Sequence, residues 1–160
     1  KGAYRNLGED RQIGLWMASR LYKAPLVLVD LGSAITIDVL KKRGVYGGGI
    51  ILPGFKMWAK SLKHGTALLP ETRYRRLRIG QLLGKSTKSC IRSGLCFGLV
   101  TMINGLLSEI KRKHGKNCSV ILTGGDLDKV SSRLSHKHIK NDSLVLRGLY
   151  ELFYNRGEVR

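Results

Sequence analysis

Acidic residues are scarce in this sequence, which contains 11 Asp and Glu against 29 Lys and Arg and carries a formal net charge of +18. Such an excess can attract nucleic acid or another polyanion, although net charge reports on solubility and association and not on fold. Basic clusters at 41–43, 73–78 and 111–116 lack regularly interleaved aromatic residues, so no platform for stacked bases is indicated. We therefore interpret the charge first as a basic solvated surface and keep nucleic-acid binding as the less favoured alternative.

Cysteine and long apolar runs are also sparse. Cys90, Cys96 and Cys118 are odd in number and include no CxxC pair, which argues against a disulfide framework and against a zinc site. Apolar runs such as 49–53 and 119–122 are strand-length, far below the roughly 20 residues that a bilayer span needs. With no signal-like pattern at the start, we expect a cytoplasmic protein without a membrane helix.

Hydrophobic periodicity predicts one α/β domain, because 160 residues with 42% hydrophobic content can bury a core. Three strands follow one another across tight turns, which indicates an antiparallel meander inside a mixed sheet flanked by helices. A long helix is expected between a cap at Ser86 or Thr87 and Gly115. The predicted strands are 26–29, 34–40, 45–52 and 119–122, the other predicted helices are 10–22, 55–63, 127–134 and 144–154, and 64–84 is predicted as loop.

Glycine-bearing turns follow two of these strands, Asp-Leu-Gly-Ser at 30–33 and Thr-Gly-Gly-Asp at 123–126. Glycine lets a backbone approach a phosphate closely, and the bared N–H groups can donate to anionic oxygens. Either turn taken alone is more typical of a structural turn. The segment 80–86 resembles a Walker A loop, but three residues separate its glycines where four are required, so a P-loop NTPase is excluded.

The segments DLGSAITID, GGGIILPG, GKST and TGGD occur in the order and at the spacing of the type III pantothenate kinase family, and LGEDR and LVLRGLY extend the resemblance over 4–149. The chain resembles the C-terminal half of that family. The resemblance implies a ribonuclease H-like, actin-like ATPase domain, in which two similar halves clamp ATP. It implies an inter-domain, substrate-binding helix segment at 1–23 and the C-terminal ATPase domain at 24–160.

The resemblance also implies roles for individual residues. Asp10 corresponds to the catalytic carboxylate, which accepts the proton of the pantothenate hydroxyl, and Asp30 to the ligand of a monovalent cation, K⁺ or NH₄⁺. Pantothenate contacts correspond to Tyr4, Gly8, Glu9, Asp10, Arg11 and Thr87, and ATP contacts to Gly32, Ser33, Thr123, Gly124 and Gly125. From the residues alone, Asp10 and Thr87 are also typical of helix caps, and Asp38 is either a neighbour of the phosphates or a partner of its local turn.

The activity that the resemblance implies is the phosphorylation of pantothenate to 4'-phosphopantothenate, the first step of coenzyme A synthesis, by a cytoplasmic homodimer using ATP and Mg²⁺. The family's N-terminal half, with its own phosphate loop, is not among these residues, and half of a clamp should not catalyse alone. The segment between Tyr4 and Gly8 is shorter than in the family. Two alternatives remain open, a non-catalytic regulator of the same fold and a phosphotransferase for another small alcohol.

Overall fold

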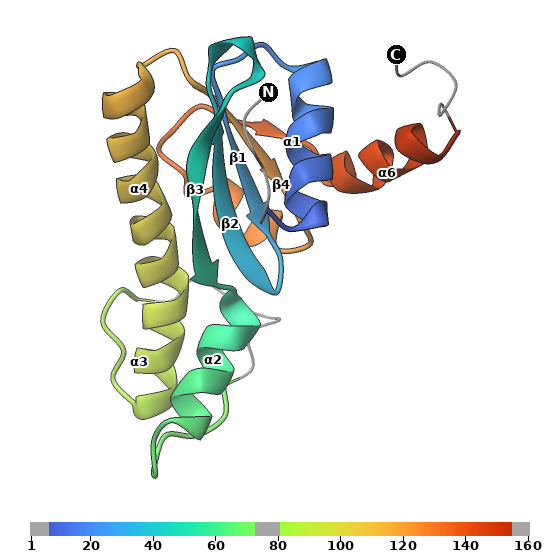
Figure 1. The fold of residues 1–160 in the computed structure, drawn as a ribbon. Helices are drawn as coiled ribbons and strands as arrows, with labels where there is room; N and C mark the ends of the chain where they lie inside the picture. Colours follow the sequence, from blue (N-terminus) through green and yellow to red (C-terminus); the bar gives the residue numbers. More distant parts are fainter. Residues whose placement is uncertain (1–6, 73–80, 155–160) are drawn as a thin grey trace.

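A five-stranded sheet forms the centre of the molecule in this computed structural model, which describes residues 7–72 and 81–154 (Figure 1). The strand order is β3-β2-β1-β4-β5, with β1, β2 and β3 antiparallel and β4 parallel to both β1 and β5. The mixed sheet and its three-stranded antiparallel meander confirm the predicted architecture. The strands are β1 (Leu26–Leu31), β2 (Ala34–Leu40), β3 (Tyr46–Pro53), β4 (Ser119–Thr123) and β5 (Ile139–Lys140), of which only β5 was not predicted.

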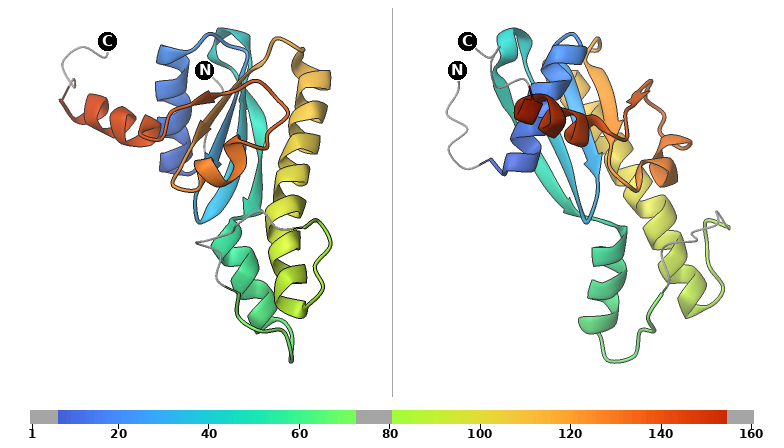
Figure 2. Two further views of the ribbon diagram at one scale, coloured as in Figure 1. Left: turned by 180° about the vertical axis from the view of Figure 1, so that it is seen from behind. Right: turned by 90° about the vertical axis from the view of Figure 1, so that its right-hand side faces the viewer.

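Helices cover both faces of the sheet, because side chains along each strand alternate between two apolar cores. On one face, α4 (Leu99–His114) packs through Leu99, Ile103 and Leu107 onto residues such as Ile37 and Leu122. On the other face, α1 (Glu9–Leu21) and α6 (Leu144–Tyr154) cover Leu26, Leu28, Leu40 and Ile121 (Figures 1 and 2). We call this second face the α1 face.

The predicted long helix is present, running from Thr87 to His114 with a π-helical turn at Gly94–Gly98 between α3 (Thr87–Ser93) and α4. Ser86 is its N-cap, because the Ser86 hydroxyl accepts from the backbone N–H of Ser89 at 3.3 Å. Length and composition alone would let this helix cross a membrane. However, four of its apolar side chains are at most 1% exposed in the core beside the sheet, namely Leu95, Leu99, Ile103 and Leu107. This burial is typical of a core helix.

An arm extends beyond one end of the sheet and contains α2 (Phe55–His64) and α3 (Figure 1). The described parts of the predicted loop at 64–84 contain no strand, and helix occurs in them only at His64, the last residue of α2. Helix α5 (Leu127–Ser131) is shorter than predicted, since tighter turns link Arg133 and Leu134 to the carbonyls of Val130 and Ser131. The proposed division at residue 23 stays a prediction, although α1 shares a core with the strands that follow it.

Candidate functional site

The two glycine-bearing turns lie against each other at one end of the sheet. Strands β1 and β4 are parallel neighbours with Asp30 opposite Thr123, so the turns that follow them leave the same sheet edge. The backbone N–H of Asp126 donates to the carbonyl of Leu31 at 2.9 Å. Gly124 has φ +94°, and a Cβ there would lie 2.4 Å from Oδ1 of Asp30. Only glycine therefore allows this contact between the turns.

A third segment, from the end of β3, closes onto the first turn. The backbone N–H of Gly54 donates to the carbonyl of Ser33 at 3.1 Å. A Cβ on Gly54 would lie 2.3 Å from the carbonyl oxygen of Gly32, so a larger residue would push the turn away. Gly54 is also the N-cap of α2, which places a helix N-terminus beside Gly32 and Ser33. Gly54, directly after β3, thus supports the turn at 30–33 from outside.

The α1 face changes from apolar to acidic toward this end of the sheet. Leu28 and Asp30 are two residues apart on β1, as Leu40 and Asp38 are on β2, so strand alternation puts each pair on one face. Leu28 and Leu40 belong to the core under α1. Beyond that core the same face carries Asp30 and Asp38, where α1 begins with Glu9 and Asp10.

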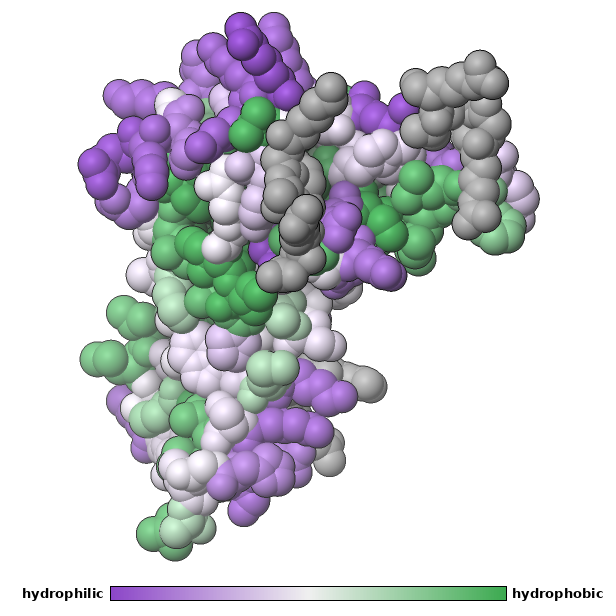
Figure 3. Space-filling view, viewed as in Figure 1, coloured by the Kyte–Doolittle hydropathy of each residue, from purple (hydrophilic) through white to green (hydrophobic). Residues whose placement is uncertain are grey.

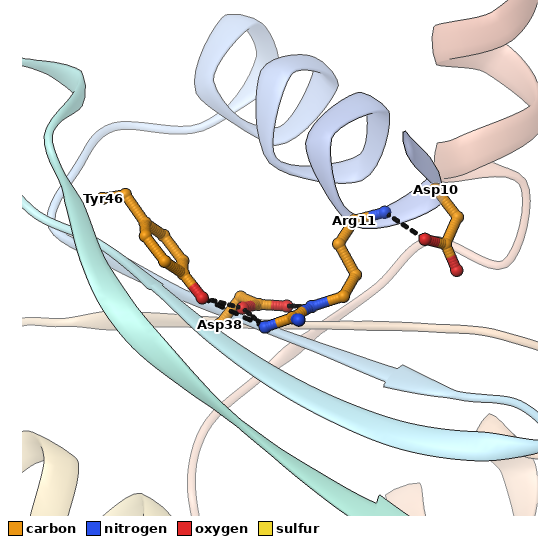
Figure 4. Close-up of polar contacts among 4 residues, drawn as sticks. All are labelled: Asp10, Arg11, Asp38 and Tyr46. Atoms are coloured by element: carbon orange, nitrogen blue, oxygen red, sulfur yellow. Dashed lines mark hydrogen bonds and ion pairs between the residues drawn. The ribbon is translucent and has the colours of Figure 1, made fainter. Parts of the chain in front are cut away.

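Arg11, Asp38 and Tyr46 form one polar cluster between α1 and the sheet (Figure 4). Nε of Arg11 donates to Oδ2 of Asp38 at 2.9 Å, and Nη2 donates to Oδ1 at 2.5 Å and to the Tyr46 hydroxyl at 3.0 Å. The Tyr46 hydroxyl donates to Oδ1 of Asp38 at 2.9 Å. A Cβ on Gly49 would lie 2.2 Å from that Oδ1, so glycine at position 49 leaves room for the cluster.

This cluster corrects the sequence-based interpretation of Asp38. Asp38 does not bond its local turn, because both carboxylate oxygens contact Arg11, 27 residues away in sequence, and its place beside the phosphates stays a prediction. The Asp38 side chain is 1% exposed and that of Arg11 15% exposed. The only signal in the sequence was an acidic residue inside an otherwise apolar strand, which indicates a buried charge with a partner.

Charge and burial shift the acidity of three groups here. The hydrogen bond from Arg11 to Asp38 raises the pKa of Arg11 above its ordinary value, against the opposing effect of burial. Burial raises the pKa of the Tyr46 hydroxyl, and its bond to Asp38 adds to the rise. Burial is also the largest cause that raises the pKa of Asp30, followed by the charges of Asp10 and Asp38. Among the described residues, no ion pair involves Asp30.

Asp10 is exposed in the first turn of α1. Its Oδ1 accepts from the backbone N–H of Arg11 at 2.8 Å, and its carboxylate lies apart from the side-chain contacts of Arg11, Asp38 and Tyr46 (Figure 4). A Cβ on Gly8 would lie 2.8 Å from that Oδ1, so Gly8 leaves the carboxylate room. The N-cap of α1 is Gly8 and not Asp10, but Asp10 still bonds a backbone N–H of the first helical turn through Oδ1.

The structure brings together most of the predicted site residues, but not all. Gly8 to Arg11, Asp30 to Ser33 and Thr123 to Gly125 share one end of the sheet. Thr87 is the first residue of α3, at the far end of the arm, and is not brought to this group (Figure 1). Tyr4 lies outside the described residues. The described ranges contain no group of three His, Cys, Asp or Glu side chains that could hold a metal ion.

Comparisons with known proteins point to one family. The family model for type III pantothenate kinase matches residues 2–109. The chain is 36% identical over 157 residues to a type III pantothenate kinase of Persephonella marina, covering 96% of this chain and 61% of that protein. It is 34% identical over 147 residues to a type III pantothenate kinase of Caulobacter vibrioides, covering 91% of this chain and 56% of that protein. The chain thus spans less than two thirds of the length of these relatives.

A solved structure resembles the fold over nearly the whole chain. It is that of a conserved putative Baf family transcriptional activator from Campylobacter jejuni, with a TM-score of 0.68 and 23% identity. The match covers 99% of this chain and 69% of that one. At this identity the likeness concerns the fold alone. Together with the mixed sheet it supports the predicted ribonuclease H-like, actin-like ATPase fold class.

Proposed function

Because this chain belongs to the type III pantothenate kinase family, we propose that it forms the part of an ATP-dependent pantothenate kinase that carries the catalytic carboxylate and one side of the ATP site. The reaction is the phosphorylation of pantothenate to 4'-phosphopantothenate in coenzyme A synthesis. The observation that carries the proposal is the direct contact between the turns at 30–33 and 123–126, on the sheet face where α1 presents Asp10.

ATP is proposed to lie along these two turns. Backbone N–H groups in glycine turns suit phosphate oxygens, and the nearby N-terminus of α2 favours negative charge. Gly32 and Ser33 are the proposed contacts of the phosphates, with the Ser33 hydroxyl as a donor, since the N–H of Gly32 already donates to the carbonyl of Ala34 at 3.1 Å. Thr123, Gly124 and Gly125 are proposed to follow the adenosine. Phosphoryl transfer depends mainly on positioning and charge stabilisation, which is what such turns provide.

A monovalent cation, K⁺ or NH₄⁺, is proposed to bind at Asp30, and Mg²⁺ is proposed to accompany ATP. The residues present fit a cation, because Asp30 is a partly buried carboxylate whose pKa is raised by burial and which forms no ion pair within 7–72 and 81–154. A bound cation supplies the positive charge that this carboxylate and the ATP phosphates lack. Asp30 is the one protein ligand that we propose for it.

Pantothenate is proposed to bind at the start of α1. Arg11 uses Nε and Nη2 for Asp38 and Tyr46, so its guanidinium is held in one orientation and Nη1 can donate to a carboxylate such as that of pantothenate. The exposed carboxylate of Asp10, one residue earlier, then accepts the proton of the substrate hydroxyl as the phosphoryl group is transferred. Asp38 and Tyr46 act through Arg11 and are positioning residues.

The complete activity requires more than this chain. We propose that the remaining part of the family fold closes the ATP clamp and that the enzyme is a cytoplasmic homodimer. Contacts of pantothenate with Gly8, Glu9, Tyr4 and Thr87 stay predictions. Because Thr87 lies in the arm, away from the strand turns, another part of the enzyme must bring pantothenate to it. A non-catalytic regulator is not favoured, because the curated relatives are named as kinases.

A coupled ADP-release assay with pantothenate tests the proposal on the complete protein. Asp10→Asn keeps the size of the side chain but removes the base, so we expect a rate loss on the order of a hundredfold or more. Asp128→Asn is the matched control, since Asp128 is 86% exposed and pairs only with Lys140 among the contacts described. Equal rates for wild type and Asp10→Asn would remove Asp10 from the mechanism.

A further inference from the structure

The arm carries Thr87, a predicted pantothenate contact, away from the sheet. Thr87 begins α3, which continues through the π-helical turn Gly94–Gly98 into α4. The arm projects beyond the sheet in the space-filling view (Figure 3). The contacts at the base of the arm therefore decide where Thr87 lies.

The π-helical turn at this base sets the orientation of α3. A π-helical turn holds one residue more than an α-helical turn, so it changes the rotation of the helix that precedes it. One residue corresponds to about 100° around the axis of an α-helix, since a turn takes about 3.6 residues. Conversion of the turn to regular α-helix would thus rotate Thr87 by about 100° relative to Leu99 and Ile103, which pack α4 on the sheet.

Arg133 contacts this turn from outside the helix. Its Nη1 donates to the carbonyl of Cys96 at 2.7 Å, and its guanidinium carbon lies 4.2 Å from the centre of the Phe97 ring. Both residues belong to the π-helical turn. A charged donor makes a stronger hydrogen bond than a neutral one, and a guanidinium over an aromatic ring adds a cation–π attraction. Within 7–72 and 81–154, no ion pair with a carboxylate competes for the charge of Arg133.

The backbone that carries Arg133 is itself held in place. The side-chain amide of Asn104 in α4 donates to the carbonyl of Arg133 at 3.3 Å. Its Oδ1 accepts from the N–H and from the hydroxyl of Ser135, each at 3.0 Å. The N–H of Arg133 donates to the carbonyl of Val130, a fully buried residue of α5. The guanidinium therefore reaches the π-helical turn from a restrained backbone.

Helix α5 links this contact to the proposed ATP turn. It begins directly after the turn at 123–126, where the N–H of its N-cap Asp126 donates to the carbonyl of Leu31 at 2.9 Å. Nζ of Lys129 pairs with Asp126 and lies 5.7 Å from the centre of the ring of Phe55, the first residue of α2. The segment that follows the ATP turn thus contacts the start of α2 as well as the π-helical turn.

We propose that Arg133 is a positioning residue, which maintains the π-helical turn at Gly94–Gly98 and thereby orients Thr87 toward pantothenate. The inference rests on the proposed function, in which Thr87 contacts pantothenate. It extends that function by joining Thr87 to the ATP turn through α5, although the fold places the two apart. Arg133 acts through the π-helical turn and is assigned no contact with either substrate.

Hydrogen–deuterium exchange of the 160-residue chain tests the structural step without any substrate. Arg133→Ala removes the donor to Cys96 and the charge over Phe97, so backbone amides of 87–98 should exchange at least about tenfold faster than in wild type. Amides of the strands should exchange equally in both proteins. Arg133→Lys keeps a charged donor and should restore part of the protection. The matched control is Arg112→Ala on the same long helix, whose side chain is 77% exposed and pairs with Glu109.

Steady-state kinetics of the complete protein test the step toward the substrate. Arg133→Ala should raise KM for pantothenate about tenfold and KM for ATP by less than about twofold, because the ATP turn keeps its own bond to the turn at 30–33. Arg133→Lys should restore part of the pantothenate KM, and Arg112→Ala should match wild type. Phe97→Leu removes the ring beneath the guanidinium, should act in the same direction, and serves where Arg133→Ala does not fold.

Unchanged exchange of 87–98 in Arg133→Ala and Phe97→Leu would overturn the proposal. Faster exchange throughout the sheet, or equal rises of the two KM values, would also overturn it and assign Arg133 to general stability. A wild-type protein without pantothenate-dependent ADP release would instead remove the proposed function and with it the substrate role of Thr87. The exchange result would then still decide whether Arg133 maintains the π-helical turn.

Discussion

At the scale of single residues, Asp38 determines how Arg11 is presented. The carboxylate is 1% exposed, and both its oxygens accept from the guanidinium, so rotation of Arg11 would leave a buried charge without its partner. Tyr46 adds a bond to each of the two, and Gly49 gives all three groups their space. Arg11 is therefore oriented before any substrate arrives, which lowers the entropy cost of binding a carboxylate.

Asp38→Asn is expected to weaken both folding and substrate binding. In this variant an NH₂ group replaces one acceptor oxygen and faces the guanidinium of Arg11. We therefore expect a loss of about 1.5–3 kcal/mol in the free energy of unfolding. In the complete enzyme, KM for pantothenate should rise more than KM for ATP, because Arg11 is proposed to contact pantothenate alone. Urea unfolding and steady-state kinetics measure the two effects. A variant indistinguishable from Asp128→Asn in both assays would contradict the positioning role.

Asp30 gives a pH-dependent prediction. Its pKa is raised by burial and by Asp10 and Asp38 from an ordinary value of 3.8, so the folded state binds the proton more tightly than the unfolded state. The protonated carboxyl stabilises the fold at low pH, and this contribution is lost as pH rises from about 3.8 through the raised pKa. Asp30→Asn should thus be more stable than wild type at neutral pH and lose that advantage on acidification.

Thermal unfolding in tetramethylammonium buffers, without K⁺ or NH₄⁺, measures this difference. Adding K⁺ at constant ionic strength should then raise the melting temperature of wild type more than that of Asp30→Asn, because only the carboxylate attracts the cation. If the difference in melting temperature between the two proteins did not change with pH, the surroundings of Asp30 would not be destabilising its ionised form.

At the scale of elements, the contact between α1 and α6 depends on Gly148, and the contact between α1 and β1 on Gly14. A Cβ on Gly148 would lie 2.7 Å from Cγ2 of Ile13 and 3.2 Å from Cβ of Met17, and one on Gly14 would lie 3.0 Å from Cδ2 of Leu28. Gly148→Val should separate the helices and cost about 1–3 kcal/mol by overpacking. Gly105→Ala, in the exposed middle of α4 with no atom within 4 Å of the added Cβ, should stabilise by about 0.5–1 kcal/mol.

Urea unfolding curves distinguish the two substitutions. Glycine is unfavourable inside any helix, so propensity alone would make both variants more stable than wild type. Opposite signs for Gly148→Val and Gly105→Ala are therefore the expected result. A stabilised Gly148→Val would mean that α6 does not pack closely on α1.

Local patterns were sufficient to predict most elements. Helix α6 occupies the predicted 144–154, and the predicted strands 34–40 and 119–122 lie within one residue of β2 and β4. Helix α6 and the strand at 34–40 are long enough to show their pattern of apolar residues, and 119–122 is a short continuous apolar run typical of a buried strand. Strand β5 has only two residues, both exposed, and therefore carries no period to detect. The π-helical turn at Gly94–Gly98 keeps nearly helical spacing, so it was hidden within the predicted long helix.

The candidate site was harder to predict, because its contacts join distant segments. The turn at 30–33 meets the turn at 123–126 only through the parallel pairing of β1 and β4, which no local pattern records. The glycines at 47–54 are visible in the sequence, but the reason that glycine is needed there is not. In the structure, Gly49 and Gly54 make room for neighbouring protein atoms. Asp38 stands out in the sequence as an acidic residue in a strand, whereas its pairing with Arg11 is visible only in the folded structure.

At the scale of the whole molecule, charge is unevenly distributed. The acidic side chains of Asp10, Asp30 and Asp38 lie near one another at the site end of the sheet, since the charges of Asp10 and Asp38 contribute to the raised pKa of Asp30. Lysines gather at the opposite end, where Lys23, Lys42 and Lys116 line one groove with His114. Like charges this close together repel, so the basic end contributes to the repulsion that a net charge of +18 brings to the folded state.

Salt should therefore stabilise the chain, and the basic end should account for part of the effect. At about 10 mM salt the screening length is about 30 Å, so all cations of this end repel one another, whereas at about 150 mM it falls to about 8 Å. We expect the melting temperature to rise by about 2–4 °C, which corresponds to roughly 1 kcal/mol for a domain of this size. Differential scanning fluorimetry over this range measures the rise.

The substitution Lys42→Gln should reduce this rise in melting temperature more than Lys60→Gln does. Lys60 is an exposed lysine of α2, in the arm. Equal responses of the two variants would mean that the repulsion is spread over the surface, because Lys60 lies far from the groove of Lys23, Lys42 and Lys116.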